Sequence, residues 1–286
     1  MQPAELLKKV QQLELKSKKL TSHLFGGEYK SAFKGRGMTF KEVKEYSPED
    51  DIRFIDWNVS ARMGNTYTKV FEEEREWNVF ILADISASTF LGGNNSKQQL
   101  ITELSAVLSF SAAANKDKTG MVFCSGEVEK YIPSAKGKQH ILYMLRELLQ
   151  LSPKNQQTEL GKGLQFIDKI CRHKSIIFIL SDFADKGYET VLQKIASKHD
   201  VVGIKVYDTS DFELPKLGLI TLQDAETGSQ IWFNTNNPQH QKAYRHQFEE
   251  IQAITRHNFK MAKADLIEIA TNEDYVPKLQ QFFLQR

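Results

Sequence analysis

The sequence predicts an α/β protein in which helices cover both faces of a mostly parallel sheet. From Trp77 onward, short apolar runs alternate with longer segments whose apolar residues recur at helical spacing. The short runs are apolar at consecutive positions, as in strands that are buried on both faces of a parallel sheet. Sheets of this kind bind ligands at the carboxyl ends of their strands. Functional residues are therefore expected where the apolar runs end.

The composition is that of an ordinary globular protein. The 286 residues are 41% hydrophobic and 26% charged, and the formal net charge of +2 gives no global reason to expect nucleic-acid binding. The N-terminus lacks the apolar core of a signal peptide, and no stretch approaches the roughly 20 apolar residues of a membrane span. Cys124 and Cys171 lie in apolar patterns and are expected to be buried thiols. These features predict a cytoplasmic protein.

We divide the chain into residues 1–76 and 77–286. The first part opens with a predicted amphipathic helix over 4–24, whose apolar positions are Leu6, Val10, Leu13, Leu20 and Leu24. Its lysines could touch a membrane or nucleic acid, although a solvated outer face is the simpler interpretation. Residues 25–76 are charged with scattered aromatics, and we expect short strands and turns that pack on the larger domain.

The second part contains the sheet. The predicted strands are NVFILAD, TGMVFCS, an edge strand EVEKYIP, SIIFILSD, DVVGIKVYD and a last strand ADLIEIAT. The predicted helices between them are SKQQLITELSAVLSFSAAANK, with Ser96 and Gln99 at capping-box spacing, then KQHILYMLRELLQ, TELGKGLQFIDKIC and residues 186–198. The tail adds a hairpin with its turn at 226–228, a helix from PQHQKAYRHQF onward and a closing helix EDYVPKLQQFFLQR.

Oxygen-bearing side chains gather where two of these strands end. Asp84, Ser86 and Ser88 follow NVFILAD, and Asp182 ends SIIFILSD. Right-handed crossovers bring both ends to one edge of the sheet, and Thr158 opens the helix that leads into the second strand. Hydroxyls and carboxylates without His or Cys suit Mg²⁺. If the aspartates act through water, the ion keeps much of its charge and favours an acidic ligand from a partner.

Each of these residues also has a purely structural interpretation. Ser86 and Ser88 can cap the turn after the strand, and Thr158 is a good helix N-cap. Asp182 can be an ordinary turn residue. The five residues together favour the metal site. The seven histidines are scattered and show no zinc-ligand spacing.

The five residues resemble the metal-ion-dependent adhesion site of von Willebrand factor A domains. In that family an Asp-x-Ser-x-Ser motif with a later Thr and Asp binds Mg²⁺ or Mn²⁺, and a partner carboxylate completes the coordination. All five positions are matched, by Asp84, Ser86, Ser88, Thr158 and Asp182. The resemblance implies a von Willebrand A-like fold and a metal-dependent protein–protein interaction.

The segment before this motif is similar to that of the bacterial "domain of unknown function fifty-eight" proteins, which join it to a von Willebrand A-like domain. Its pattern is carried by Gly35, Gly37, Phe40, Tyr46, Asp50, Asp51, Arg53, Ile55, Asp56, Trp57, Ser60, Ala61 and Arg62. Glu49 stands where the family usually has Gly, and Thr89 where a Met often follows the last serine. The resemblance covers nearly the whole chain. It implies an adaptor that works with a MoxR-type AAA+ ATPase.

The charged residues of this segment have two interpretations. They could form a ligand site, but a buried ion-pair network that docks the segment on the sheet domain is the simpler one. Tyr46 and Trp57 would be the apolar filling of that network. Its charged members would be Asp50, Asp51, Arg53, Asp56 and Arg62.

No motif for a phosphate loop or a nucleophile elbow is present, and we expect a protein without catalytic activity. The alternative is a divergent haloacid-dehalogenase-like Mg²⁺ phosphatase that uses Asp84, since a strand-ending aspartate and a later DFAD are typical of such enzymes. They carry a second aspartate two residues after the first as general acid, and Ser86 in that place cannot do this near neutral pH. An extracellular adhesin is disfavoured by the missing signal peptide and the low cysteine count.

Overall fold

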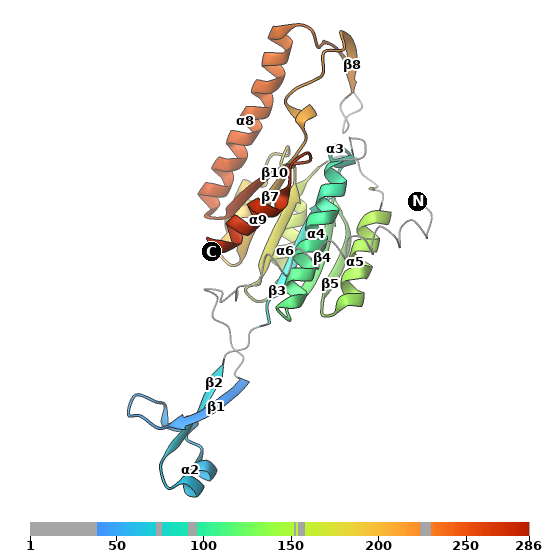
Figure 1. Ribbon diagram of the computed structural model, residues 1–286. Helices are drawn as coiled ribbons and strands as arrows, with labels where there is room; N and C mark the ends of the chain where they lie inside the picture. The colour runs from blue at the N-terminus through green and yellow to red at the C-terminus, as the bar shows by residue number, and fades with distance from the viewer. Residues whose placement is uncertain are drawn as a thin grey trace. The chain divides into compact units, whose positions relative to one another are not determined.

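The computed structural model describes residues 39–72, 76–90, 96–151, 153, 158–223 and 230–285. They belong to two compact units, one within residues 29–76 and one that starts at Trp77 (Figure 1). The amphipathic helix predicted over 4–24 lies outside the described residues.

The smaller unit is an antiparallel strand pair with a helical connection. Strands β1 (Thr39–Glu45) and β2 (Tyr67–Glu72) are joined through the 3-10 turn η1 (Ile52–Phe54) and the helix α2 (Trp57–Met63). The helix starts where the Asp56 carboxylate accepts hydrogen bonds from two backbone N–H groups, and it ends at Gly64, whose φ of 80° suits glycine. The predicted short strands and turns are present, with a short helix in addition.

The ion pairs described in this unit join its own residues, and docking of the segment on the sheet domain through a buried network stays a prediction. They join near neighbours on the chain or across the hairpin: Lys44–Asp50, Asp51–Arg53 and Lys69–Asp56. Tyr46 is half-buried, and Trp57, the first residue of α2, is exposed within its own unit. Each of the three carboxylates accepts from a local backbone amide and pairs with a neighbouring cation.

The larger unit is built on a six-stranded sheet in the order β10-β7-β6-β3-β4-β5. β5 is an edge strand, as predicted, and it runs antiparallel to β4, whereas all other neighbouring strands are parallel. The strand bounds are β3 (Asn78–Asp84), β4 (Lys118–Cys124), β5 (Val128–Ala135), β6 (Ile176–Ser181), β7 (Asp200–Tyr207) and β10 (Asp265–Ala270).

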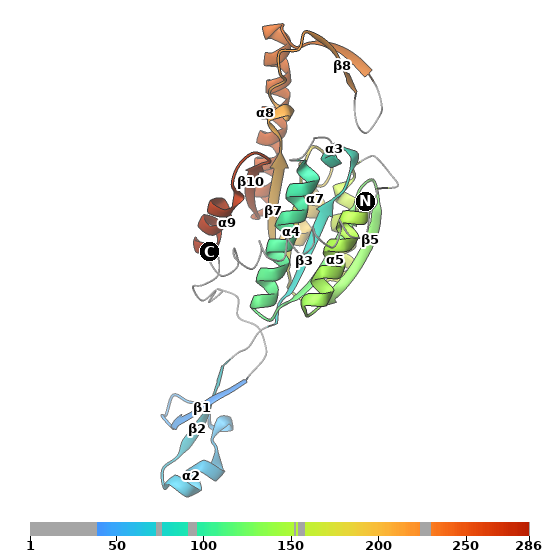
Figure 2. The ribbon, with the colours of Figure 1, turned by 45° about the vertical axis from the view of Figure 1, so that its right-hand side comes forward.

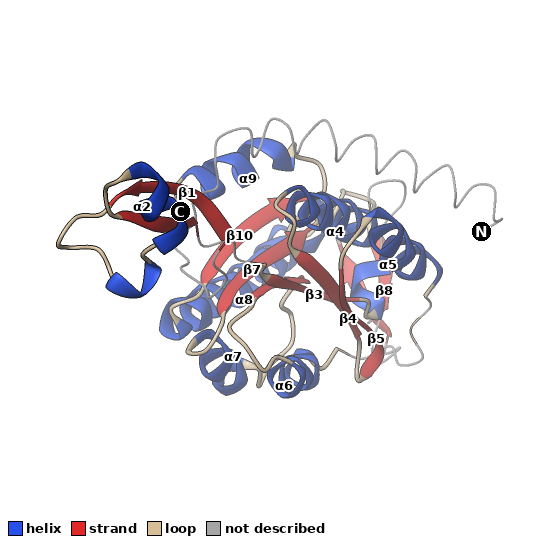
Figure 3. Ribbon diagram, turned by 90° about the horizontal axis from the view of Figure 1, so that it is seen from below, coloured by secondary structure: helices blue, strands red, loops and turns tan. Residues whose placement is uncertain are grey.

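Helices cover both faces of this sheet, which confirms the predicted architecture (Figure 3). One face carries α4 (Lys97–Ala114), α5 (Lys138–Gln150) and α9 (Tyr275–Leu284), and the other carries α6 (Leu160–Ile170), α7 (Glu189–Ala196) and α8 (Pro238–Ala262). Alternate residues of β3 enter the two cores, Ile81 on the first face and Leu82 on the second. Burial on both faces explains why the strand is apolar at consecutive positions.

An extension leaves the sheet after β7. It consists of the 3-10 turn η2 (Thr209–Asp211), the hairpin of β8 (Leu219–Gln223) and β9 (Gln230–Asn234), and the first half of α8. We call the described residues of 209–248 the arm, which projects beyond the carboxyl edge of the sheet (Figure 2). The hairpin is as predicted, although its expected turn at 226–228 lies outside the described residues. The ring of Phe233 packs against Tyr244 and fixes the hairpin to α8.

The close approach of β7 and α8 generates a prediction. A Cβ atom at Gly203 would lie 2.3 Å from the ring of Phe259, which is fully buried. We expect Gly203→Ala to lower the free energy of unfolding by about 1–3 kcal/mol, because the crowded core must shift. The matched control is Gly161→Ala in α6, where the nearest atom would be 3.7 Å away. Urea denaturation measures both, and an equal effect of the two changes would contradict the packing described.

Candidate metal centre

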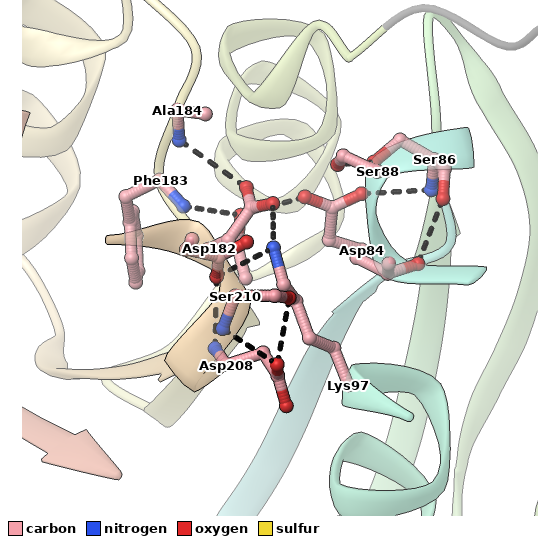
Figure 4. A network of polar contacts seen from close by, with 12 residues as sticks. Asp84, Ser86, Ser88, Lys97, Asp182, Phe183, Ala184, Asp208 and Ser210 are labelled. Carbon is pink, nitrogen blue, oxygen red and sulfur yellow. Dashed lines mark hydrogen bonds and ion pairs between the residues drawn. The ribbon is translucent and has the colours of Figure 1, made fainter. Parts of the chain in front are cut away.

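Asp84 ends β3 inside the protein. Its side chain is only 2% exposed, and both carboxylate oxygens accept hydrogen bonds (Figure 4). Oδ1 accepts from the backbone N–H of Ser86 at 2.9 Å, and Oδ2 accepts from the hydroxyl of Ser181 at 2.6 Å. Ser181 ends the neighbouring strand β6, so two parallel strands bring these groups to one edge of the sheet.

The two serines of the motif lie together in the turn after β3. Ser86 is buried and Ser88 is half-buried, and their hydroxyl oxygens are 3.0 Å apart. Two ligands on adjacent corners of an octahedron with Mg–O distances of about 2.1 Å would be about 3.0 Å apart. The hydroxyl of Thr89 donates to the carbonyl of Ser86 at 2.7 Å and holds the short helix α3 (Ala87–Phe90) in place. The two hydroxyls are hydrogen-bonded to each other, at a separation that is compatible with two ligands on one ion.

Asp182 follows β6 at the same edge and is also buried. Its Oδ1 accepts from the backbone N–H of Ala184 at 3.2 Å. Burial, together with the nearby charge of Asp182, raises the pKa of Asp84 to about 7. Two carboxylates that repel each other in a buried place favour a cation between or beside them.

Thr158 lies at the same end of the sheet, but it is not the N-cap residue of α6. It is half-buried just before α6, and the next residue, Glu159, occupies the N-cap position without a side-chain bond. The first amide of α6, at Leu160, donates instead to the Asp185 carboxylate at 2.8 Å. The interpretation of Thr158 as the helix N-cap is therefore wrong, because a side chain from the loop after β6 does this work.

Lys97 is a member of the site that sequence reasoning missed. It is 6% exposed, and its ammonium lies 3.2 Å from Asp182 Oδ2 and 3.0 Å from Asp211 Oδ2 (Figure 4). Burial alone would lower the pKa of Lys97, but the attraction of the two carboxylates outweighs it and raises the pKa. One signal could have indicated it: Lys97 directly follows the N-cap Ser96, where the helix dipole disfavours a cation.

Asp211 belongs to the arm and is itself fixed. Its Oδ2 also accepts from the backbone N–H of Asp208 at 2.8 Å, and the Asp208 carboxylate accepts from Ser210, so η2 is held by a capping box. Thr271, after β10, donates to the other oxygen of Asp208. The candidate centre is thereby connected through Lys97 to the beginning of the arm.

The donor set fits Mg²⁺ or Mn²⁺. All side-chain donors of the five predicted residues are oxygens, and hard oxygen ligands are those that these ions prefer. Within the described parts of the chain, no three His, Cys, Asp or Glu side chains are grouped as metal ligands, so a centre here depends on the hydroxyls. Lys97 supplies a positive charge next to Asp182, and any ion would share that carboxylate with it.

The arrangement also defines the class of protein. A mostly parallel α/β sheet with an oxygen-rich carboxyl edge after its central strand is the arrangement that the resemblance to von Willebrand A domains predicts. The profile of a family described as "Protein of unknown function DUF58" matches residues 42–256, and the chain belongs to this family. The family membership predicted from the motifs is confirmed.

Relatives with similar sequences are bacterial. The "Uncharacterized protein Rv1480" of Mycobacterium tuberculosis (strain ATCC 25618 / H37Rv) is 27% identical over 282 residues, which cover 96% of this chain and 87% of the relative. The "Uncharacterized protein YeaD" of Bacillus subtilis (strain 168) is 31% identical over 107 residues, which cover 37% of this chain and 25% of the relative.

A solved structure has a similar fold. An "aerotolerance-related membrane protein" from Bacteroides fragilis NCTC 9343 superposes with a TM-score of 0.50 at 17% identity, over 73% of this chain and 97% of that one. "Conserved hypothetical protein BatB" from Bacteroides thetaiotaomicron has a TM-score of 0.49 at 16% identity, over 73% of this chain and 100% of that one. In the described part of the present chain, no helix has the length and apolar character needed to cross a membrane.

A second buried lysine near the centre generates a prediction. Lys205 in β7 is 1% exposed, and its ammonium has no hydrogen-bond partner among the residues that the structure describes; it lies 5.7 Å above the ring of Phe248. Burial lowers the pKa of Lys205 to about 8. We expect Lys205→Met to raise the free energy of unfolding at pH 7 by about 1–3 kcal/mol, because it removes a buried charge that lacks a hydrogen bond.

The pH dependence checks this. Between pH 8 and the ordinary lysine pKa of 10.5, the unfolded chain binds more protons than the folded one, so stability should rise with pH in that window. Lys205→Met should flatten this rise, whereas Lys242→Met on an exposed turn of α8 should leave it unchanged. A less stable Lys205→Met protein that kept the rise would show that the pKa of Lys205 is not lowered by burial.

Proposed function

We propose that this protein is a metal-dependent protein–protein interaction module. Asp84, Ser86, Ser88, Thr158 and Asp182 hold Mg²⁺ or Mn²⁺, and a Glu or Asp carboxylate of a partner completes the coordination. The observation that carries the proposal is the pair of hydroxyls 3.0 Å apart beside two buried carboxylates at the carboxyl edge of the sheet. Edges of this kind are where open α/β sheets bind their ligands.

The residues have separate roles in this proposal. The serine hydroxyls are neutral ligands, which leave the ion with most of its positive charge. Asp84 already accepts a hydrogen bond at each oxygen, so it suits a contact through water better than a direct one. An ion held in this way keeps an affinity for an external carboxylate.

The site does not favour the phosphatase alternative. Such an enzyme needs a general acid two residues after its nucleophilic aspartate. Ser86 occupies the place of the general acid, and its buried hydroxyl faces Ser88. We therefore propose a protein without catalytic activity.

The proposed partner is a MoxR-type AAA+ ATPase in the cytoplasm, for which the chain would act as an adaptor. This rests on the family resemblance, and no residue of the chain encodes the identity of the partner. The chemical requirement on the partner is an accessible carboxylate that can reach the metal.

Direct metal binding is the first test. Asp84→Asn keeps the shape of the side chain and removes its charge, so we expect Mg²⁺ binding measured by calorimetry to weaken by at least about tenfold. Asp265→Asn, at the amino end of β10, is the matched control and should bind Mg²⁺ as the unchanged protein does. Equal Mg²⁺ affinity of the Asp84→Asn and unchanged proteins, both folded by circular dichroism, would contradict the proposed site.

Partner capture is the second test. The immobilised protein is exposed to the native cytosol with Mg²⁺ or with EDTA, and retained proteins are identified by mass spectrometry. We expect an AAA+ ATPase to be retained only with Mg²⁺, and to be lost with Asp84→Asn, since removing one member of a buried charged contact costs about 2–5 kcal/mol. An identical set of proteins with Mg²⁺ and with EDTA would show that the metal does not govern binding.

A further inference from the structure

Lys97 occupies a position that the proposed function does not explain. A divalent ion at the centre would have to share Asp182 with a lysine that is already bound to it at 3.2 Å. We infer that Lys97 is a positioning residue that limits the metal affinity of the centre and couples metal binding to the arm. The inference rests on the proposed metal-binding function.

The first part of the inference follows from charge. Lys97 is almost inaccessible to water, so its ammonium is the cation that balances Asp182 and Asp211 when no divalent ion is bound. Like charges a few ångströms apart repel strongly where little water separates them. An ion that draws on Asp182 therefore meets repulsion from Lys97. The lysine makes metal binding weaker than the same oxygen atoms would without it.

The second part follows from the contacts on the other side of Lys97. Asp211 accepts from Lys97 and from the backbone of Asp208, which fixes η2 at the start of the arm. The carbonyl of Ser210 accepts from the hydroxyl of Tyr244 at 2.8 Å, and Tyr244 belongs to α8. Tyr244 also packs on Phe233 of the hairpin. A continuous set of contacts thus leads from Asp182 through η2 to α8 and the hairpin of the arm.

The coupling works through competition for Lys97. When Asp182 interacts with a divalent ion, its ion pair with Lys97 weakens. Lys97 then interacts more strongly with Asp211, so the Lys97–Asp211 contact at the base of the arm becomes stronger. Because coupling between two binding events is reciprocal, anything that pulls Asp211 away from Lys97 must change the metal affinity by the same factor. A partner that moves the arm would therefore regulate the metal centre.

The metal affinity tests the first part. Calorimetric titration with MgCl₂ should show Lys97→Met binding Mg²⁺ at least about tenfold more tightly than the unchanged protein, because the repelling charge is gone. Asp211→Asn should bind more weakly, because Lys97 then relies on Asp182 alone. Lys242→Met, a change of the same type at an exposed site, should bind as the unchanged protein does. If Lys97 had only a structural role, the Mg²⁺ affinities of Lys97→Met and Asp211→Asn would not shift in opposite directions.

A charge-neutral double variant tests the second part and covers the case in which Lys97→Met alone fails to fold. Lys97→Met with Asp211→Asn removes one positive and one negative charge, so its Mg²⁺ affinity should stay within a few-fold of that of the unchanged protein. Hydrogen exchange with and without MgCl₂ reports on the arm. In the unchanged protein, Mg²⁺ should slow exchange at the amides of residues 208–213, and in the double variant this response should be lost.

The outcomes separate the two proposals. If the unchanged protein binds no Mg²⁺, the proposed function fails and the inference fails with it. If the unchanged protein binds Mg²⁺ and Lys97→Met binds it equally or more weakly, only the inference about affinity is overturned. If the arm of the double variant still responds to Mg²⁺, the coupling through Lys97 is overturned. Opposite shifts in the Mg²⁺ affinity of Lys97→Met and Asp211→Asn, together with loss of the hydrogen-exchange response in the double variant, support the inference.

Discussion

The burial of the Asp84 carboxylate is the constraint on which the carboxyl edge of the sheet depends. A carboxylate that is 2% exposed at the end of a strand buried on both faces carries a large desolvation cost. The protein reduces it with the backbone amide of Ser86 and the hydroxyl of Ser181. Even so, burial raises the pKa of Asp84 to about 7. The turn after β3 and the end of β6 are held together by this one group.

The same constraint explains why the neighbouring elements have the form they do. Phe183 adopts a left-handed φ of 52° and its amide donates to the hydroxyl of Ser181, so the chain turns sharply after β6. That turn leaves Asp182 beside Asp84, where a second carboxylate without a cation would be unfavourable. Lys97, the first residue of α4, supplies this cation, although the helix dipole disfavours a positive charge at the N-terminus of a helix. The turn at Phe183 and the placement of Lys97 beside Asp182 are thus both linked to the buried Asp84 carboxylate.

The sequence could predict the fold and most of the centre because both follow from local patterns. Consecutive apolar residues such as Ile81 and Leu82 require burial on both faces, and parallel strands share a carboxyl edge, which places Asp84 and Asp182 together. Lys97 could not be predicted in this way, because it meets Asp182 across 85 positions of the chain and no periodicity records such a pair.

One failed interpretation shows the same limit. Asp185 caps α6 from 25 positions away, so the polar residue Thr158 next to the helix was no reliable sign of its N-cap. Local sequence defines which segments fold, whereas partners distant in the chain decide how individual polar residues are used.

Under the proposed function, the charge balance of the centre has a consequence for how metal and partner bind. Neutral hydroxyls give an ion little compensation for its lost hydration, and Lys97 adds repulsion beside Asp182. The metal alone would therefore be held weakly. A partner carboxylate adds the negative charge that the ion lacks and that Lys97 also attracts, so each ligand improves the binding of the other. The combination of neutral ligands with a resident lysine thus favours a centre that fills when the partner arrives, and the contact from Lys97 to Asp211 passes that event on to the arm.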